Sequence, residues 1–152
     1  MASNRRTIEG CFQLMGGAFA GAGAASSELK TVLMSLGVPQ GIVRRASIAA
    51  FEAEMNVIIH AVAGTLHYEV TPAKIHIDVT DMGPGIEDID LAMQEGYSTA
   101  PDWVREMGWG AGMGLPNIKR NADAFKLDSV VGEGTTLEIN IFLTEENYAD
   151  NT

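Results

Sequence analysis

The residues from 108 to 117 have the composition of a phosphate-binding loop. Glycine occupies every second position from Gly108 to Gly114, and a helical pattern follows. A backbone without Cβ atoms can turn its N–H groups toward an anion at close range. A helix that begins directly afterwards adds free N–H groups and the positive end of its dipole, and Pro116 suits its first turn. We therefore expect a phosphate cradle that continues into a helix.

A flexible linker is the alternative interpretation of these glycines. Further polar residues typically follow a linker, whereas apolar residues at helical spacing follow this stretch: Leu115, Ile118, Ala122 and Phe125. The pattern favours the cradle, and two stretches upstream strengthen that interpretation.

These two upstream stretches carry polar side chains that suit the same site. Glu52 and Asn56 are four residues apart in the longest helical pattern, so they lie one above the other on one edge of a helix. Asp81 ends an alternating strand pattern just before Gly83 and Gly85, where its carboxylate can reach into a cleft. In isolation, an Asp before such glycines is more often only a turn-forming residue.

The composition limits the classes of partner. The chain has 152 residues and a formal net charge of −10, which makes it a poor candidate for binding nucleic acid or an anionic membrane. A phosphate ligand would need local donors and a metal ion, and no segment is long and apolar enough to span a bilayer. Cys11 is the only cysteine, which fits a reducing compartment. We expect one cytoplasmic domain over 1–152, with an ordered core over 8–143.

Hydrophobic periodicity predicts the order of the elements. They are an edge strand at 8–14, a loop at 16–25, a short helix capped by Ser26 and Ser27, a helix at 39–64, a hairpin with strands at 66–70 and 73–80, a short helix at 89–95, a mobile lid near 98–107, a helix at 115–124, and a hairpin with strands at 125–131 and 136–143.

The helix at 39–64 carries two further expectations. An apolar stripe is predicted to form its buried face: Ile48, Phe51, Met55, Ile58 and Val62. Glu54 projects nearly opposite to Asn56, so we expect it to be a solvated surface charge.

The motifs occur in an order that resembles one enzyme superfamily. Glu52-x-x-x-Asn56, Asp81-x-Gly83-x-Gly85, the alternating glycines up to Gly114-Leu115, and Gly132-x-Gly134-Thr135 resemble the GHKL, or histidine-kinase-like, ATPases of gyrase, chaperone, histidine-kinase and mismatch-repair proteins. No single motif is specific, but the ordered set is. Within the superfamily the chain is similar to small bacterial serine kinases of the anti-sigma-factor type. The segments 93–99 and 110–116 are most like the subgroup that switches stress signalling.

The resemblance implies a fold and a role for each residue of the set. The fold is an α/β (α+β) two-layer sandwich of the Bergerat type, with helices over one face of a mixed, mostly antiparallel sheet. Glu52 is the implied general base, Asn56 the Mg²⁺ ligand, and Asp81, with Thr135, the acceptor for the adenine amino group. The other implied ATP-binding residues are Gly83, Gly85, Ile86, Ser98, Thr99, Arg105, Gly108, Gly110, Gly112, Met113, Gly114 and Leu115.

Two residues are candidates for the cation near the γ-phosphate. Arg105 is the candidate, Lys119 is the runner-up, and an exposed surface charge is an equally good interpretation of Arg105.

The resemblance implies a cytoplasmic, Mg²⁺-dependent protein serine/threonine kinase that uses ATP. Its implied substrate is a small anti-anti-sigma-like protein, and its second partner is a sigma factor or a phosphatase regulator; a homodimer is left open. One alternative is a nucleotide-gated module that binds a partner without significant turnover. Another is a catalytic domain acting on a histidine elsewhere, which the single-domain length and the lid sequence disfavour. The sequence does not separate kinase from binding module, because binding and catalysis share most of these residues.

Overall fold

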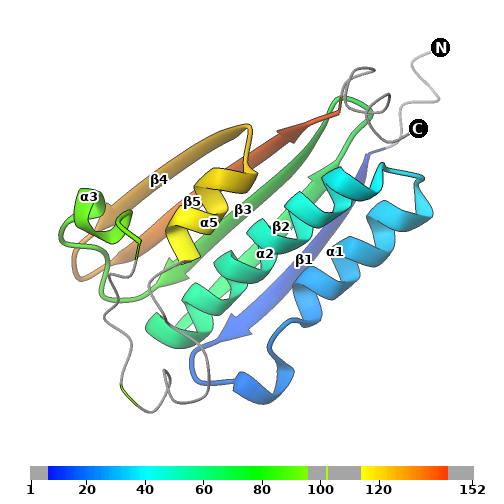
Figure 1. The fold of residues 1–152 in the computed structure, drawn as a ribbon. Coiled ribbons are helices and arrows are strands. Elements are labelled where there is room, and N and C mark those ends of the chain that lie inside the picture. Colours follow the sequence, from blue (N-terminus) through cyan, green and yellow to red (C-terminus); the bar gives the residue numbers. More distant parts are fainter. Residues whose placement is uncertain (1–6, 96–101, 103–113, 144–152) are drawn as a thin grey trace.

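The computed structural model describes residues 7–95, 102 and 114–143, which form a layer of helices on a sheet (Figure 1). The elements in chain order are β1 (Ile8–Met15), a 3-10 turn (Phe19–Gly21), α1 (Ala24–Ser35), α2 (Gln40–His60), β2 (Ala63–Val70), β3 (Lys74–Met82), α3 (Ile89–Ala92), α5 (Gly114–Asn121), β4 (Ala124–Val130) and β5 (Gly134–Phe142).

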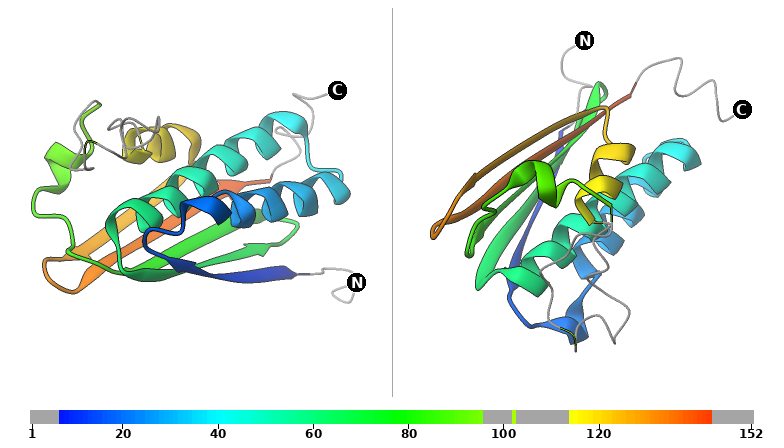
Figure 2. Two further views of the ribbon diagram at one scale, coloured as in Figure 1. Left: turned by 90° about the horizontal axis from the view of Figure 1, so that it is seen from below. Right: turned by 60° about the vertical axis from the view of Figure 1, so that its left-hand side comes forward.

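The sheet has five strands in the order β1-β2-β3-β5-β4. Helices α1, α2 and α5 cover one of its faces, with α2 in the middle (Figure 2). The predicted two-layer sandwich is therefore confirmed, and β1 is an edge strand as expected. All four strand pairings are antiparallel, so the described strands include none of the parallel pairing that a mixed sheet implies.

The core lies between the sheet and the helices. Inward side chains alternate along the strands and are buried, for example Leu66, Ile77 and Ile139. From α2, mainly small residues pack against them: Ala46, Ala49, Ala50, Ala53 and Val57. Small side chains let a helix lie close to a sheet, so this alanine face positions α2 over β2 and β3.

The predicted apolar stripe of α2 is wrong at three of its five positions. Met55 and Ile58 are buried, but Ile48 and Phe51 are only partly buried. Val62 follows the helix and is 73 % exposed. The large side chains suggested a stripe that is rotated away from the alanine face.

The start of α1 also differs from the prediction. The helix begins at Ala24, so Ser26 and Ser27 lie inside it instead of capping it, and the N-cap is Gly23 at φ +96°. The predicted loop at 16–25 contains a 3-10 turn. Among the described residues, no helix is long and apolar enough to cross a membrane.

Glu54 is the clearest correction, because it is buried, not solvated. Its side chain is 1 % exposed and accepts hydrogen bonds from the backbone N–H groups of Gly23 (3.0 Å), Ala25 (3.3 Å) and Ser26 (3.2 Å). These are the unpaired N–H groups of the first turn of α1, where the helix dipole also favours a negative charge. Glu54 therefore fixes the start of α1 to the middle of α2.

We expect Glu54→Gln to destabilise the protein. A glutamine keeps one acceptor oxygen but turns an NH₂ group toward backbone donors, at a cost of about 1–3 kcal/mol. Thermal unfolding followed by circular dichroism should show the midpoint several degrees lower than in the wild type. Glu9→Gln, which removes an exposed carboxylate on β1, is the control. Equal midpoints for the two variants would contradict the anchoring role of Glu54.

Candidate nucleotide-binding site

Helix α2 presents Glu52 and Asn56 toward the start of α5. A Cβ atom added to Gly114 would lie 3.0 Å from Asn56 Oδ1 and 3.2 Å from Glu52 Oε2. The two oxygens therefore converge on the first residue of α5, and they lie on one edge of α2, as their i, i+4 spacing predicts. Because Gly114 has no side chain, the backbone at the end of the glycine stretch approaches both groups closely.

Glu52 lies in a partly desolvated place. Its side chain is half-buried, and this burial raises the pKa of its carboxyl group above the ordinary value. Burial disfavours the charged form, so the group becomes a better proton acceptor when it is ionised. The position and the raised pKa are what proton transfer from a nearby hydroxyl needs.

Asp81 lies on the inward face of β3, near the end of the strand. The backbone N–H of Thr135 donates a hydrogen bond to Asp81 Oδ1 (3.2 Å), which leaves the second carboxylate oxygen able to accept from a ligand. Burial raises the pKa of Asp81, and the bond from Thr135 opposes that shift.

A glycine opposite Asp81 brings the two halves of the site together. Gly64 on β2 pairs with Asp81, and a Cβ atom there would lie 2.9 Å from Val57 Cγ1 and 3.2 Å from Asp81 Cβ. Val57 follows Asn56 on α2. The missing side chain thus lets α2 approach the sheet beside Asp81, one residue along the helix from Asn56.

The turn after β3 packs against the β4–β5 hairpin. Gly85 has φ +76°, and a side chain there would overlap the backbone of Val130. The Gly132 N–H donates to the Pro84 carbonyl oxygen (2.9 Å), and the Ile86 N–H donates to Ser129 Oγ (2.7 Å). The predicted turn residues are therefore next to Asp81 and Thr135, as the motif order implies.

Ser129 is a residue that the sequence interpretation missed. Its hydroxyl donates to the Gly134 carbonyl oxygen (3.2 Å) and lies 2.9 Å from Thr135 Oγ1. Since the Ser129 proton is used on Gly134, Thr135 donates to Ser129 and keeps its lone pairs for another donor. A hydroxyl at an inward position of β4, two residues after Leu127, was the available signal.

The described residues form two parts of the predicted set, one around Gly114 and one around Asp81. Leu115 is half-buried against the core, and Lys119 is exposed on α5. The predicted lid and most of the cradle lie outside the described residues, and with them Ser98, Thr99, Arg105, Gly108, Gly110, Gly112 and Met113.

The amide oxygen of Asn56, beside the start of α5, suits a hard cation shared with phosphates. Mg²⁺ is typically bound by one or two protein oxygens together with water and phosphate. Over the ranges that the structure describes, no three His, Cys, Asp or Glu residues form a metal cage. The residues fit a phosphate-bound Mg²⁺ better than a resident structural metal.

The family profile described as the histidine kinase-like ATPase domain matches residues 20–141. The chain belongs to this family. The superfamily that the motifs indicate is thereby confirmed, and the family description implies the use of ATP.

Two relatives and one solved structure extend the family assignment. The serine/threonine-protein kinase RsbT of Bacillus subtilis is 36 % identical over 98 residues, covering 62 % of this chain and 68 % of the relative. The anti-sigma F factor of Priestia megaterium is 30 % identical over 125 residues, covering 82 % of this chain and 75 % of the relative. A chain of the SiaB–SiaC complex from Pseudomonas aeruginosa has the same fold, with a TM-score of 0.61 at 13 % identity over 91 % and 92 % of the two chains.

Proposed function

We propose that this histidine kinase-like ATPase is an Mg²⁺-dependent protein serine kinase. One observation carries the proposal: the Glu52 carboxylate and the Asn56 amide oxygen converge on the residue where the glycine stretch enters α5. A general base, a cation ligand and a phosphate-binding helix start are the parts that phosphoryl transfer to a hydroxyl needs. The names of the two relatives, a serine/threonine kinase and an anti-sigma factor, support the same class.

The adenine end of ATP is assigned to Asp81 and Thr135. Asp81 has one oxygen left for the amino group of the base, and the lone pairs of Thr135 are free beside it. The backbone of Gly83, Gly85 and Ile86 then lies next to the adenine base. The phosphates extend toward Gly114, with Gly108, Gly110, Gly112, Met113 and Leu115 as their further neighbours, and Ser98, Thr99 and Arg105 complete the proposed site; Lys119 is the alternative cation.

Asn56 Oδ1 is the proposed ligand for Mg²⁺. When bound, the ion neutralises the charge of the phosphates and orients them. The side chain of Asn56 contributes position, because it is fixed on a helix that packs tightly on the sheet.

Glu52 is the proposed base. It takes the proton of a serine hydroxyl while the serine oxygen forms a bond to the γ-phosphorus, and the bond from that phosphorus to the bridging oxygen of ADP breaks. The products are phosphoserine, ADP and a protonated Glu52, which then releases its proton to solvent.

The proposed substrate is a small anti-anti-sigma-like protein in the cytoplasm, and the second partner is a sigma factor or a phosphatase regulator. The test is transfer of labelled phosphate from ATP to serine in candidate proteins of that type. We expect labelled phosphoserine with Mg²⁺ and none after chelation by EDTA. ATP binding without transfer to any candidate would favour the nucleotide-gated binding module.

A further inference from the structure

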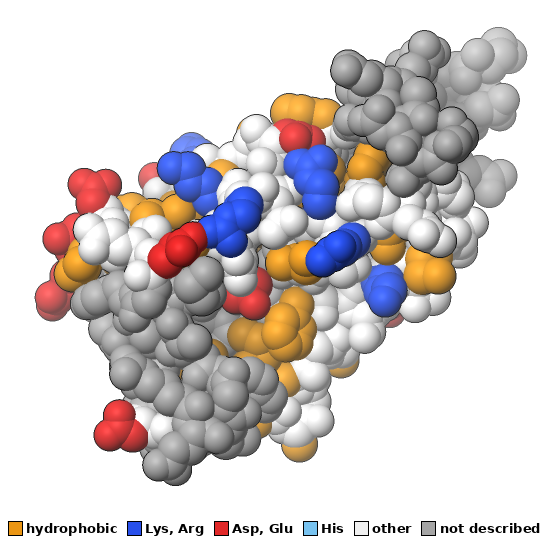
Figure 3. Space-filling model, viewed as in Figure 1, with side chains coloured by type: hydrophobic (Ala, Val, Ile, Leu, Met, Phe, Trp, Pro, Cys, Tyr) orange, Lys and Arg blue, Asp and Glu red, His pale blue; other side chains and the backbone are white. Residues whose placement is uncertain are grey.

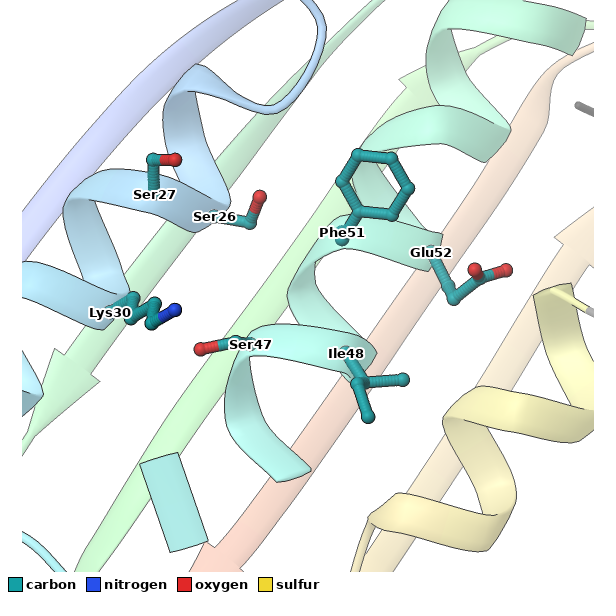
Figure 4. A pocket seen from close by; sticks show the side chains of 7 residues that line it. All are labelled: Ser26, Ser27, Lys30, Ser47, Ile48, Phe51 and Glu52. Atoms are coloured by element: carbon teal, nitrogen blue, oxygen red, sulfur yellow. The ribbon is translucent and has the colours of Figure 1, made fainter. Parts of the chain in front are cut away.

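A groove between α1 and α2 adjoins the proposed catalytic residue. It has a volume of about 270 Å³ and is lined from α1 by Ser26, Ser27 and Lys30 and from α2 by Ser47, Ile48, Phe51 and Glu52. Figure 4 shows Lys30 reaching toward α2 from one wall, while the Glu52 carboxylate points toward α5. The groove therefore leads from a cation on α1 to the proposed base.

The apolar part of the groove consists of side chains that the core does not use. Ile48 and Phe51 are the two members of the predicted stripe that α2 turns away from its alanine face. The Phe51 ring closes over the start of α1, where its Cε1 would lie 3.6 Å from a Cβ atom at Gly23. Partly exposed apolar side chains that adjoin a polar site are suited to hold part of a partner.

The charges of the helical face differ from those of the whole chain. On a protein of net charge −10, the helices α1, α2 and α5 carry five Lys and Arg residues against three Glu residues, Glu28, Glu52 and Glu54. The five cations are Lys30, Arg44, Arg45, Lys119 and Arg120. Lys and Arg side chains form a band across this face (Figure 3). Asp123 neutralises Arg45 (2.8 Å), and Glu95 pairs with Arg120. Lys30 and Arg44 are exposed and have no carboxylate partner in the described part of the chain.

We infer that the α1–α2 groove docks an acidic segment of the protein substrate. Carboxylates of that segment face Lys30 on the groove wall and Arg44, which lies one helical turn before Ile48 on α2. An apolar side chain of the segment packs on Ile48 and Phe51, and the acceptor serine lies at the Glu52 end. Charge complementarity selects the occupant, because a basic segment would meet unpaired cations here. Charges beyond about 10 Å are screened at ordinary salt, so this local band outweighs the acidic remainder of the protein. The inference rests on the proposed kinase function for the position of the serine.

A pair of synthetic peptides tests the groove without knowledge of the natural partner. One carries several Asp and Glu residues, one leucine and one serine, and the other has Lys in place of each acid. Fluorescence anisotropy of the labelled peptides measures Kd without ATP. We expect the acidic peptide to bind more tightly, with an affinity that falls as salt rises. Equal or tighter binding of the Lys peptide would overturn the inference.

Variants locate the peptide on the protein. Lys30→Glu should raise Kd about three- to tenfold and Phe51→Ser about tenfold. Lys126→Glu reverses an exposed charge on β4 and is the matched control, expected to leave Kd unchanged. Because Phe51 is partly buried, Arg44→Glu repeats the test without touching packing. If Lys30→Glu and Arg44→Glu bind the acidic peptide with the same Kd as Lys126→Glu, the groove is not the docking site.

The same variants separate this inference from the kinase proposal. ATP affinity should be unchanged in Lys30→Glu, because Lys30 is not assigned to the nucleotide. Groove binding of the acidic peptide, with no labelled phosphate on any candidate protein, keeps the docking site and refutes the kinase. Transfer to the peptide with the same KM in wild type and Lys30→Glu keeps the kinase and refutes the docking site.

Discussion

Asp81→Asn should weaken ATP binding about ten- to hundredfold. In the wild type, the Thr135 N–H donates to Asp81 Oδ1. The asparagine keeps an oxygen for this bond but turns an NH₂ group toward the adenine amino group. Two donors then face each other in a half-buried place, which costs about 1–3 kcal/mol. Isothermal titration calorimetry with Mg-ATP measures the change directly.

Asp128→Asn is the matched control for this substitution. Asp128 is 68 % exposed on β4 and pairs loosely with Lys126, so the same loss of charge should leave ATP affinity unchanged. An Asp81→Asn protein that binds ATP as tightly as the wild type would remove Asp81 from the adenine site.

The pKa of Asp81 adds a pH dependence to this prediction. Because burial raises this pKa, the carboxylate takes up a proton at a higher pH than an exposed Asp. The protonated group is a donor, so wild-type ATP affinity should fall as the pH is lowered through that pKa. Asp81→Asn should lose this pH dependence.

The sequence predicts the strands better than it predicts the helix faces. Alternation at Ile75, Ile77 and Val79 has one interpretation, because every second residue of a strand faces the same side. On α2 four alanines form the middle of the buried face, and an alanine is a weak signal of burial because it is common on both faces of helices. The large side chains Ile48 and Phe51 therefore dominated the pattern, although they lie at the groove.

The unpredicted contacts of Glu54, and the one between Ser129 and Ile86, join residues far apart in the sequence. Glu54 accepts hydrogen bonds from backbone N–H groups about thirty residues earlier in the chain. Ser129 accepts one from the backbone N–H of Ile86, 43 residues earlier. Helical spacing says where Glu54 points on α2, but not that the start of another helix lies there. The Glu52–Asn56 pair was accessible to prediction because both residues share one helix edge, whereas their neighbour Gly114 was placed by motif order alone.

Glu52→Gln should reduce phosphate transfer by about two to four orders of magnitude and leave ATP binding intact. Glutamine has the same shape and keeps an acceptor oxygen near Gly114, but it cannot take the proton of the attacking serine. The wild-type carboxylate makes no obligatory contact with the phosphates, and removing its charge relieves repulsion with them. ATP affinity should therefore equal or slightly exceed that of the wild type.

Burial supplies two further readouts for Glu52. Its pKa is raised in the folded state, so the ionised form opposes folding at neutral pH, and Glu52→Gln should unfold at the same temperature or higher. The base must be ionised, so wild-type transfer should fall as the pH is lowered through this raised pKa. A loss of transfer with an undiminished unfolding temperature separates a catalytic defect from a folding defect.

The control for Glu52→Gln must be another carboxylate, and Glu54 is unsuitable because it anchors α1. Glu9→Gln makes the same change of charge on β1, at the opposite edge of the sheet from the strands that α5 covers. It should transfer phosphate at the wild-type rate, measured as phosphoserine formed per minute from labelled ATP. Wild-type transfer by Glu52→Gln would refute the base assignment, because a side chain without a basic oxygen would then suffice at the start of α5.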